Sequence, residues 1–386
     1  MKDKLKQSFK SLKFYPVVLL FFVFLFGFMV LDMLWPKREK SELENRPLQQ
    51  VPAFSWRALF NNEWTADYGD YVKDQFAFRD AWIDLKARSE YFLGKTENGD
   101  VIFAPDEDGA MMFTKFYSLG NNESSYLANA QAVASFAQRH EGKVTFLLAP
   151  SASVIYKDKL PAGVPLADEE SYLDNIFEVT APYARNLDLR QLFRDHADEY
   201  IYYRTDHHWT TQGAYLAYEE FCRQLGLTPF DTAAHTAVEV EEFYGTSYSK
   251  SRLWNAVPDT LTYYPLDNAM TVEVAGETKG ETEGMYNLSA LDTRDKYSAF
   301  LWGNNGYSVI EGDGEGSVLV VKDSYGNCFT PFLTANYAQI GVVDLRYWPG
   351  NIEQLAEEYD QILILYNFQS FYKDVGIRKL NINLNQ

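Results

Sequence analysis

An uncharged apolar run near the N-terminus constrains this chain more than any other feature. The run extends from Phe14 to Leu31 (FYPVVLLFFVFLFGFMVL) and contains 18 residues. At about 1.5 Å per residue, a helix of this length approaches the ~30 Å thickness of a bilayer's hydrocarbon core. The sequence therefore predicts a transmembrane segment over residues 14–35, with Trp35, Lys37 and Arg38 in the membrane interface.

The residues that flank this run predict its orientation. Five lysines precede it, at positions 2, 4, 6, 10 and 13. Because positively charged flanks remain on the cytoplasmic side, we expect residues 1–13 to form a cytoplasmic tail and the C-terminal part to be extracytoplasmic. A cleaved signal peptide is the alternative, but the sequence DMLWPKREK that follows contains no small-x-small cleavage pattern. We therefore expect a single-pass anchor in the cell membrane.

The charge of the remaining chain limits its partners. The 386 residues have a formal net charge of −19, and residues 37–386 carry 30 basic and 52 acidic side chains. Phosphate backbones would repel so acidic a domain, which argues against a nucleic-acid partner. The two cysteines, Cys222 and Cys328, are too few for a disulfide framework, so they are either one disulfide bond or two buried thiols.

Beyond the anchor, short apolar segments alternate with helical patterns, which is typical of an α/β domain with a mainly parallel sheet. The expected strands are residues 144–150, 186–189, 200–203, 318–321, 342–345 and 362–366, and the expected helices are residues 125–140, 211–225 and 352–359. Residues 36–110 are predicted to form a juxtamembrane and helical packing region, and residues 111–386 the α/β domain. Between about 238 and 316 the pattern becomes polar and rich in turns, which predicts an inserted region of β-hairpins and loops, or a lid.

Two segments at expected strand ends carry the residues for nucleophilic catalysis, and ligands of open α/β sheets bind at such ends. Asp206 and His208 are two residues apart in TDHHWT, so in an extended segment their side chains leave the same face, and His207 leaves the other. A carboxylate that orients an imidazole is the usual activator of a serine hydroxyl. Ser324, directly after the apolar strand VLVV, is the candidate nucleophile, and the amides that follow it are suited to stabilising an oxyanion.

Further residues near these segments are candidate substrate contacts. Arg346 has planar donors for a carboxylate or carbonyl, although an ion pair with an acidic neighbour is an equal alternative. Tyr325 is predicted to line the pocket or to pack in the core, and Trp209 to pack beside the site or stack on a sugar. The candidate side-chain donors to an oxyanion are Asn304, Asn327 and Asn367.

A metal site is the main alternative for Asp206, His207 and His208, because carboxylate and imidazole are common metal ligands. Adjacent histidine side chains are expected to point apart, and the other three histidines lie in no ligand-like cluster. We therefore expect neither a metal nor another cofactor.

Four motifs together resemble the DHHW protein family: TDHHWT, KDSYGN, LLAPSASVIY and the N-terminal SELENRPL. That family is similar to the periplasmic alginate O-acetyltransferases of the SGNH hydrolase-like superfamily. The resemblance implies a flavodoxin-like three-layer α/β/α fold and a triad of Asp206, His208 and Ser324. One departure is Lys322, which stands where the superfamily has a glycine before Asp323-Ser324.

The function implied is an O-acyltransferase or O-acylesterase that acts on an extracytoplasmic polysaccharide or cell-envelope glycopolymer. A transferase would need a membrane-bound partner to supply acyl groups from the cytoplasm. The alternative is a non-catalytic glycan-binding or scaffold protein that keeps an SGNH-like fold.

Overall fold

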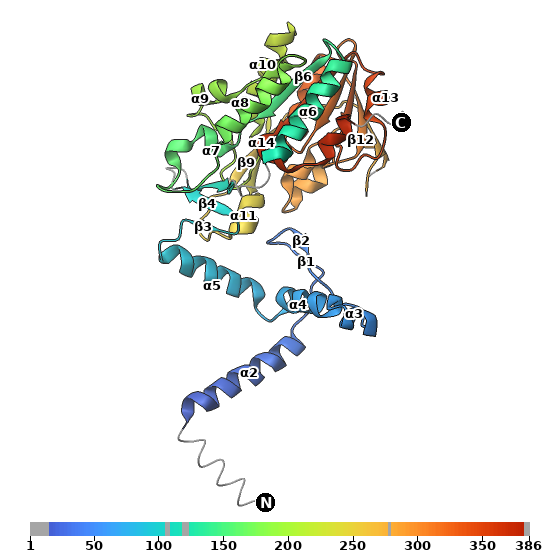
Figure 1. Ribbon diagram of the computed structural model, residues 1–386. Coiled ribbons are helices and arrows are strands. Elements are labelled where there is room, and N and C mark those ends of the chain that lie inside the picture. Colours follow the sequence, from blue (N-terminus) through green and yellow to red (C-terminus); the bar gives the residue numbers. More distant parts are fainter. Residues whose placement is uncertain (1–14, 105–108, 118–122, 277–278, 382–386) are drawn as a thin grey trace, which may run out of the picture. The chain divides into compact units, whose positions relative to one another are not determined.

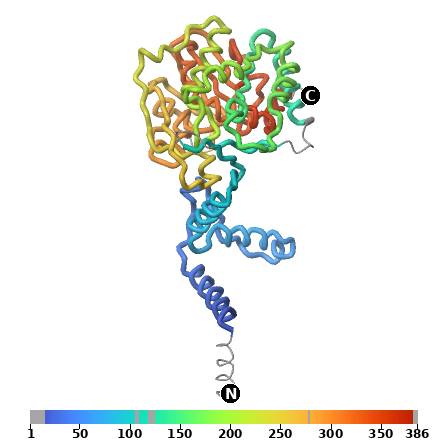
Figure 2. Tube along the Cα trace, turned by 90° about the vertical axis from the view of Figure 1, so that its left-hand side faces the viewer, coloured from blue at the N-terminus to red at the C-terminus, as the bar shows by residue number. Residues whose placement is uncertain are grey.

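The computed structural model describes residues 15–104, 109–117, 123–276 and 279–381, and the chain divides into two compact units, Met1–Gly94 and Lys95–Gln386 (Figures 1 and 2). We had expected a boundary at residue 110. The second unit begins earlier because it includes an antiparallel sheet of β3 (Glu97–Asn98), β4 (Val101–Ala104) and β5 (Met111–Thr114).

The first unit is mainly helical. Its first described helix, α2 (Pro16–Leu34), is 19 residues long, has no buried residue and is the one helix among the described residues that is long and apolar enough to cross a membrane. The lysines at positions 2–13 and Phe14 lie outside the described residues. A hairpin and three helices follow α2: β1 (Lys40–Ser41), β2 (Arg46–Pro47), α3 (Trp56–Phe60), α4 (Glu63–Gln75) and α5 (Arg79–Phe92).

An eight-stranded sheet forms the centre of the second unit, in the order β11-β10-β12-β14-β13-β15-β6-β7. Five neighbouring strands are parallel: β14 (Gln339–Val343), β13 (Ser317–Lys322), β15 (Gln361–Asn367), β6 (Val144–Ala149) and β7 (Arg185–Leu187). The expected mixed α/β fold with a mostly parallel sheet is therefore present.

Alternate residues of the parallel strands enter two hydrophobic cores, because successive side chains of a strand point to opposite faces. Val318 and Val320 pack in a core with residues of α10 (Thr211–Leu225). Leu319 and Val321 pack in a second core with residues of four helices, namely α6 (Glu123–Arg139), α8 (Glu169–Thr180), α13 (Ile352–Ala356) and α14 (Phe368–Lys373) (Figure 1).

Of two expectations about residues 200–316, the strand at 200–203 was wrong, whereas antiparallel hairpin pairs do occur after residue 238. Residues 200–203 form no strand, and Tyr202 makes only an isolated bridge to Trp209. Part of the expected insertion belongs to the main sheet, because β12 (Tyr307–Glu311) pairs antiparallel with β14 and also with β10 (Met270–Val274).

The other elements are α7 (Ala152–Ile155), η1 (Lys157–Lys159), α9 (Arg190–Asp195), η2 (Thr232–Ala234), β8 (Val238–Phe243), α11 (Thr246–Ser251), β9 (Asp259–Tyr263), β11 (Gly280–Glu281), η3 (Leu288–Asp292), η4 (Lys296–Ala299), α12 (Gly326–Phe329), η5 (Thr330–Ala335) and η6 (Gly376–Asn381).

Candidate active site

The segment that carries Asp206 and His208 is a tight loop between Tyr203 and Trp209. The Tyr203 amide donates to the His208 carbonyl at 3.3 Å, which closes the loop. Within it, Oδ1 of Asp206 accepts the His208 amide at 3.0 Å, the side-chain-to-backbone bond that defines an Asx turn. Asp206 and His208 are therefore brought together by a turn, and the extended geometry that we expected is absent.

Three side chains form a continuous chain of hydrogen bonds. His208 Nδ1 lies 2.5 Å from Asp206 Oδ1, and His208 Nε2 lies 2.7 Å from Ser324 Oγ. Asp206 and His208 are buried, whereas Ser324, two residues beyond the end of β13, is half-buried. This order of carboxylate, imidazole and hydroxyl allows the imidazole to take a proton from the hydroxyl while the carboxylate stabilises the resulting imidazolium.

The second oxygen of Asp206 is held by the start of α11. The amide and hydroxyl of Thr246 both donate to Asp206 Oδ2, at 2.7 and 3.0 Å. Gly245 permits this approach, since a Cβ atom at that position would lie 2.3 Å from Oδ2. Burial alone would raise the pKa of Asp206, but the neighbouring imidazoles and these hydrogen bonds lower it below its ordinary value. Asp206 is consequently ionised and oriented.

We had expected His207 to point away from His208, but it does not. The two rings lie with their centroids 3.9 Å apart, and His207 Nδ1 is 2.6 Å from the Thr246 hydroxyl. Partial desolvation and the neighbouring His208 lower the pKa of His207, whose side chain is 38% exposed. His207 makes no hydrogen bond to Ser324 in the described structure, which leaves His208 as the base candidate.

The carboxylate and the two imidazoles offer ligand atoms within 4.8 Å of one another. However, Asp206 Oδ1 and His208 Nδ1 are only 2.5 Å apart. Two ligands bound to one zinc ion at about 2.0–2.1 Å in tetrahedral geometry are separated by roughly 3.3 Å. The observed spacing suits a shared proton better than a metal ion.

Tyr297, in η4, is a site residue that the sequence did not reveal. Its ring stacks on the His208 ring, with centroids 3.9 Å apart and an angle of 11° between the planes. Its hydroxyl donates to the Ser324 carbonyl at 3.1 Å. Tyr297 therefore contacts both His208 and Ser324, and its position within the expected insertion gave no signal of this.

Asp259, at the start of β9, is a second residue missed from the sequence. Its buried carboxylate accepts the amides of Arg204 and Thr205, both at 2.8 Å, and also the hydroxyls of Thr205 and Tyr200. These bonds fix the backbone directly before Asp206. Burial raises the pKa of Asp259 despite these donors.

Trp209 does not contact a substrate, because its side chain is fully buried. The suggested sugar-stacking role is therefore wrong: its indole N–H donates to the Tyr325 carbonyl at 3.0 Å and ties the Asp-His loop to the Ser324 turn. Tyr325 is only 2% exposed, and its hydroxyl donates to the His207 carbonyl. Both aromatic residues hold the two segments of the site together.

A cavity of about 390 Å³ has Asp206, His207 and Tyr325 in its wall. Its lining also includes Lys250, Arg346, Lys373, Asn367 and Gln369. Arg346 makes a two-point ion pair with the buried Asp344, at 2.9 and 2.6 Å, which is the alternative we had kept open. Ser324 and His208 are not among the lining residues.

The expected oxyanion donors are mostly engaged elsewhere. The amides of Tyr325, Gly326 and Asn327 donate to Asp323 Oδ1, the Asp323 carbonyl and the Ser324 carbonyl. The Asn367 side-chain amide donates weakly to the Ala149 carbonyl at 3.4 Å, and that of Asn327 donates to Asn304 Oδ1.

Lys322 lies beneath the Ser324 turn rather than in the cavity. It is 1% exposed, and its ammonium donates to Asn327 Oδ1 at 2.5 Å and Asn304 Oδ1 at 3.2 Å. Burial lowers its pKa to about 8. Cys222 and Cys328 are both buried free thiols.

The fold and this site define a class: α/β proteins whose parallel sheet presents a hydrogen-bonded Asp-His-Ser chain beyond its strand ends. The sequence model of the DHHW protein family matches residues 108–343, and this chain belongs to that family. The resemblance found in the motifs is thereby confirmed. No curated protein matches the sequence.

Solved structures share the fold. A DHHW family protein from Eubacterium siraeum DSM 15702 is 22% identical, with a TM-score of 0.62 over 75% of this chain and 98% of that chain. Bacillus cereus PatB1, in a structure with a sulfonyl adduct, is 19% identical, with a TM-score of 0.59 over 72% and 98%. The O-acetyltransferase domain of Pseudomonas putida AlgJ is 15% identical, with a TM-score of 0.43 over 71% and 92%.

Proposed function

We propose that this protein is a membrane-anchored, extracytoplasmic O-acyltransferase or O-acylesterase that acts on a polysaccharide of the cell envelope. The observation that carries the proposal is the hydrogen-bonded chain from Asp206 through His208 to Ser324, at 2.5 and 2.7 Å. The motif resemblance to polysaccharide O-acetyltransferases supports the substrate class. It also supports the three-layer fold of the SGNH superfamily.

In the first half of the reaction, Ser324 Oγ attacks the carbonyl carbon of an acyl ester while His208 Nε2 takes the hydroxyl proton. The bond between the carbonyl carbon and the donor's oxygen breaks, and His208 returns the proton to that leaving oxygen. Asp206 stays ionised and stabilises the imidazolium. The product of this half-reaction is an acyl ester on Ser324.

In the second half, a sugar hydroxyl or water loses its proton to His208 and attacks the acyl-enzyme. The bond to Ser324 Oγ breaks, and the serine oxygen recovers its proton from His208. The cavity beside the site supports binding of a sugar acceptor, since polar and cationic groups such as Asn367, Gln369 and Lys250 line it. A transferase further requires an acyl-donor protein in the membrane.

Contacts at the end of α2 support an uncleaved anchor. Asp32 Oδ1, within α2, accepts the Ala77 amide at 3.0 Å, and the Trp35 and Phe78 rings lie 4.2 Å apart. A signal peptide that is removed would make no lasting contact with the mature protein. The N-terminus is accordingly proposed to be cytoplasmic and the α/β unit extracytoplasmic.

The test is labelling of the full-length protein with a sulfonyl fluoride, together with hydrolysis of p-nitrophenyl acetate. We expect an adduct on Ser324 by mass spectrometry, and a loss on the order of 10³-fold in hydrolysis for Ser324→Ala and His208→Ala. His207→Ala is the matched control and should retain labelling.

A wild-type protein that neither labels nor turns over would contradict the enzyme and favour the glycan-binding alternative. Stoichiometric zinc with loss of activity on chelation would favour the metal site instead. Acetate transferred to, or released from, the organism's own glycopolymers then distinguishes transferase from esterase.

A further inference from the structure

In the first unit several polar side chains are buried beside a few mostly small apolar ones, and many large apolar side chains are exposed. Asp74, Gln75 and Arg79 are at most 8% exposed, whereas Trp56 is 67% and Phe60 79% exposed. A domain surrounded by water has the opposite distribution, and contiguous exposed apolar surface marks an interaction site. We therefore expect the exposed apolar side chains of this unit to contact something other than water.

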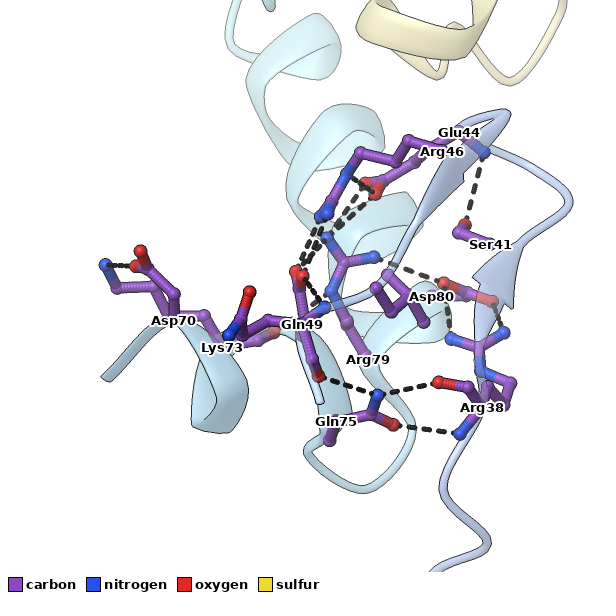
Figure 3. A network of polar contacts seen from close by, with 12 residues as sticks. Arg38, Ser41, Glu44, Arg46, Gln49, Asp70, Lys73, Gln75, Arg79 and Asp80 are labelled. Carbon is purple, nitrogen blue, oxygen red and sulfur yellow. Dashed lines mark hydrogen bonds and ion pairs between the residues drawn. The ribbon is translucent and has the colours of Figure 1, made fainter. Parts of the chain in front are cut away.

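A polar clip, comprising Arg38, Glu44, Arg46, Asp74, Gln75, Arg79 and Asp80, fixes the corner between α4 and α5 (Figure 3). Arg46 donates two hydrogen bonds to Asp74, at 2.8 and 2.6 Å, and this contact lowers the pKa of Asp74 to about 2. Arg79 donates to both oxygens of Glu44, at 3.0 and 2.9 Å. The SELENRPL motif thus holds the helices that follow it.

The same corner is attached to the end of the candidate membrane span. Lys37 Nζ donates to the carbonyls of Asp32 and Gln75, at 2.9 and 3.3 Å. The Phe28 ring, inside α2, lies 6.0 Å from the Trp82 ring of α5. Phe28 precedes the end of α2 by about 9 Å at 1.5 Å per residue, so a bilayer around α2 would place Trp82 at its boundary.

The helix α4 is amphipathic, and aromatic residues cover one of its faces. Trp64 stacks on Tyr68 at 4.9 Å, four residues along the helix, and also meets Phe54 at 5.5 Å. Asp70 and Lys73 form an exposed ion pair on the other side. Helices that lie in the plane of a membrane interface have such an aromatic face opposite a charged face.

The excess negative charge of the chain lies outside this helical unit, so an anionic membrane surface would not repel the unit strongly. Residues 37–94 carry nine basic and ten acidic side chains, whereas residues 95–386 carry 21 and 42. The acidic α/β unit is repelled by anionic lipid head groups, but the helical segment next to the anchor is nearly neutral.

We propose that α3, α4 and the start of α5 lie in the membrane-water interface on the extracytoplasmic side of the bilayer that α2 spans. The aromatic side chains in contact with lipid are then Phe54, Trp56, Phe60, Tyr68 and Trp82. The polar clip fixes these helices to the exit of α2. The anchor is then a platform of one spanning helix and three interfacial helices. This arrangement depends on α2 spanning the bilayer and is independent of the acyl-transfer chemistry.

Depth-dependent quenching in vesicles of phosphatidylcholine and phosphatidylglycerol tests this platform on the full-length chain. An environment-sensitive fluorophore is attached to Phe60→Cys or Tyr68→Cys, with Asp70→Cys as the matched control on the charged face. Cys222 and Cys328 are buried, so the unsubstituted chain provides the labelling blank. Phe24→Cys, in α2, reports on the span itself.

We expect doxyl-labelled lipid to quench the probes at positions 60 and 68 several times more strongly than the probe at 70, and aqueous iodide to show the reverse order. Equal iodide quenching at 60, 68 and 70 would overturn the proposal. Protection of positions 60 and 68 from both quenchers would also overturn it, because a protein partner would then cover the face. If Phe24→Cys is not quenched by doxyl lipid, the anchor itself is wrong and the platform falls with it, whereas labelling of Ser324 would be unaffected.

Discussion

His208 is positioned from three sides by side chains that lie far apart in the sequence. Asp206 fixes Nδ1, Ser324 meets Nε2, and Tyr297 covers the flat face of the ring. An aromatic face against an imidazole both restricts the ring's rotation and stabilises the imidazolium that forms during proton transfer. Tyr297 is thus expected to influence the reaction without touching the substrate.

Two substitutions of Tyr297 distinguish the contribution of its ring to kcat from that of its hydroxyl. Tyr297→Phe keeps the stacked ring and loses the hydroxyl contacts to the Ser324 carbonyl and to Cys328 Sγ, so we expect a small decrease in kcat. Tyr297→Leu removes the stacking surface and should lower kcat roughly tenfold, which corresponds to about 1.4 kcal/mol, with little change in KM. Steady-state hydrolysis of p-nitrophenyl acetate measures both constants. Equal kcat values for the Leu variant and the wild type would show that the stack contributes nothing.

Glu169 gives the fold a dependence on pH. It is buried at the start of α8, its Oε1 accepts the Ser151 amide at 2.7 Å, and burial raises its pKa to about 7 from an ordinary 4.5. Between these values the folded chain keeps a proton that the unfolded chain has lost, so this group's contribution to stability is complete below about pH 4.5 and is lost as pH rises through about 7.

Glu169→Gln keeps a side-chain oxygen that can accept the Ser151 amide, and it removes the ionisable carboxyl group. Relative to this variant, the wild type should lose on the order of 3 kcal/mol of unfolding free energy between about pH 4.5 and 7.5, since each pKa unit is worth 1.36 kcal/mol. Urea unfolding of the full-length protein in detergent at a series of pH values measures the difference. Parallel pH profiles for the two proteins would contradict a raised pKa at Glu169.

At the level of elements, the Asp206-His208 loop depends on neighbours that lie both earlier and later in the chain. β9 provides Asp259, α11 provides Thr246, and β5 binds the loop backbone through the Met112 amide, which donates to the Arg204 carbonyl at 2.8 Å. A loop with so few contacts of its own takes its shape from these elements. The region between β8 and η4 is accordingly part of the site's framework.

Asp259→Asn tests this support. One carboxamide oxygen cannot accept all the donors that the two carboxylate oxygens accept, and each buried donor left unpaired costs about 1–3 kcal/mol. We expect kcat to fall roughly tenfold with KM nearly unchanged, because the loop shifts without loss of the cavity. Asp267→Asn, at an exposed position shortly after β9, is the control and should behave as wild type. An unchanged kcat in Asp259→Asn would remove β9 from the framework of the site.

For the whole molecule, all the side chains proposed for catalysis belong to the second unit, and the anchor and the polar clip belong to the first. The division of charge follows the same boundary, with the excess of acidic residues after Gly94. The proposed attachment to the membrane and the proposed chemistry therefore belong to different parts of the chain.

Much of the architecture could be predicted from local patterns. The strand at Val144 and the helix Thr211–Leu225 occur where their apolar periodicity indicated, because these signals are contained in neighbouring residues. Residues 200–203 failed as a strand because their apolar and aromatic character reflects burial in a loop. The hairpins expected between about 238 and 316 are present, but the pairing of β12 with the main sheet was not predicted, because a polar edge of a sheet resembles loop sequence.

Local patterns of residues were sufficient to predict the apolar helix, the α/β alternation and the family motifs, and to identify Asp206, His208 and Ser324 as candidates. The folded chain was needed to show that an Asx turn joins Asp206 to His208, that Trp209 is buried, and that Tyr297 and Asp259 support the site. Those contacts join residues 27 to 116 positions apart, or depend on a backbone turn. Their formation follows from how the whole chain packs, which no local pattern encodes.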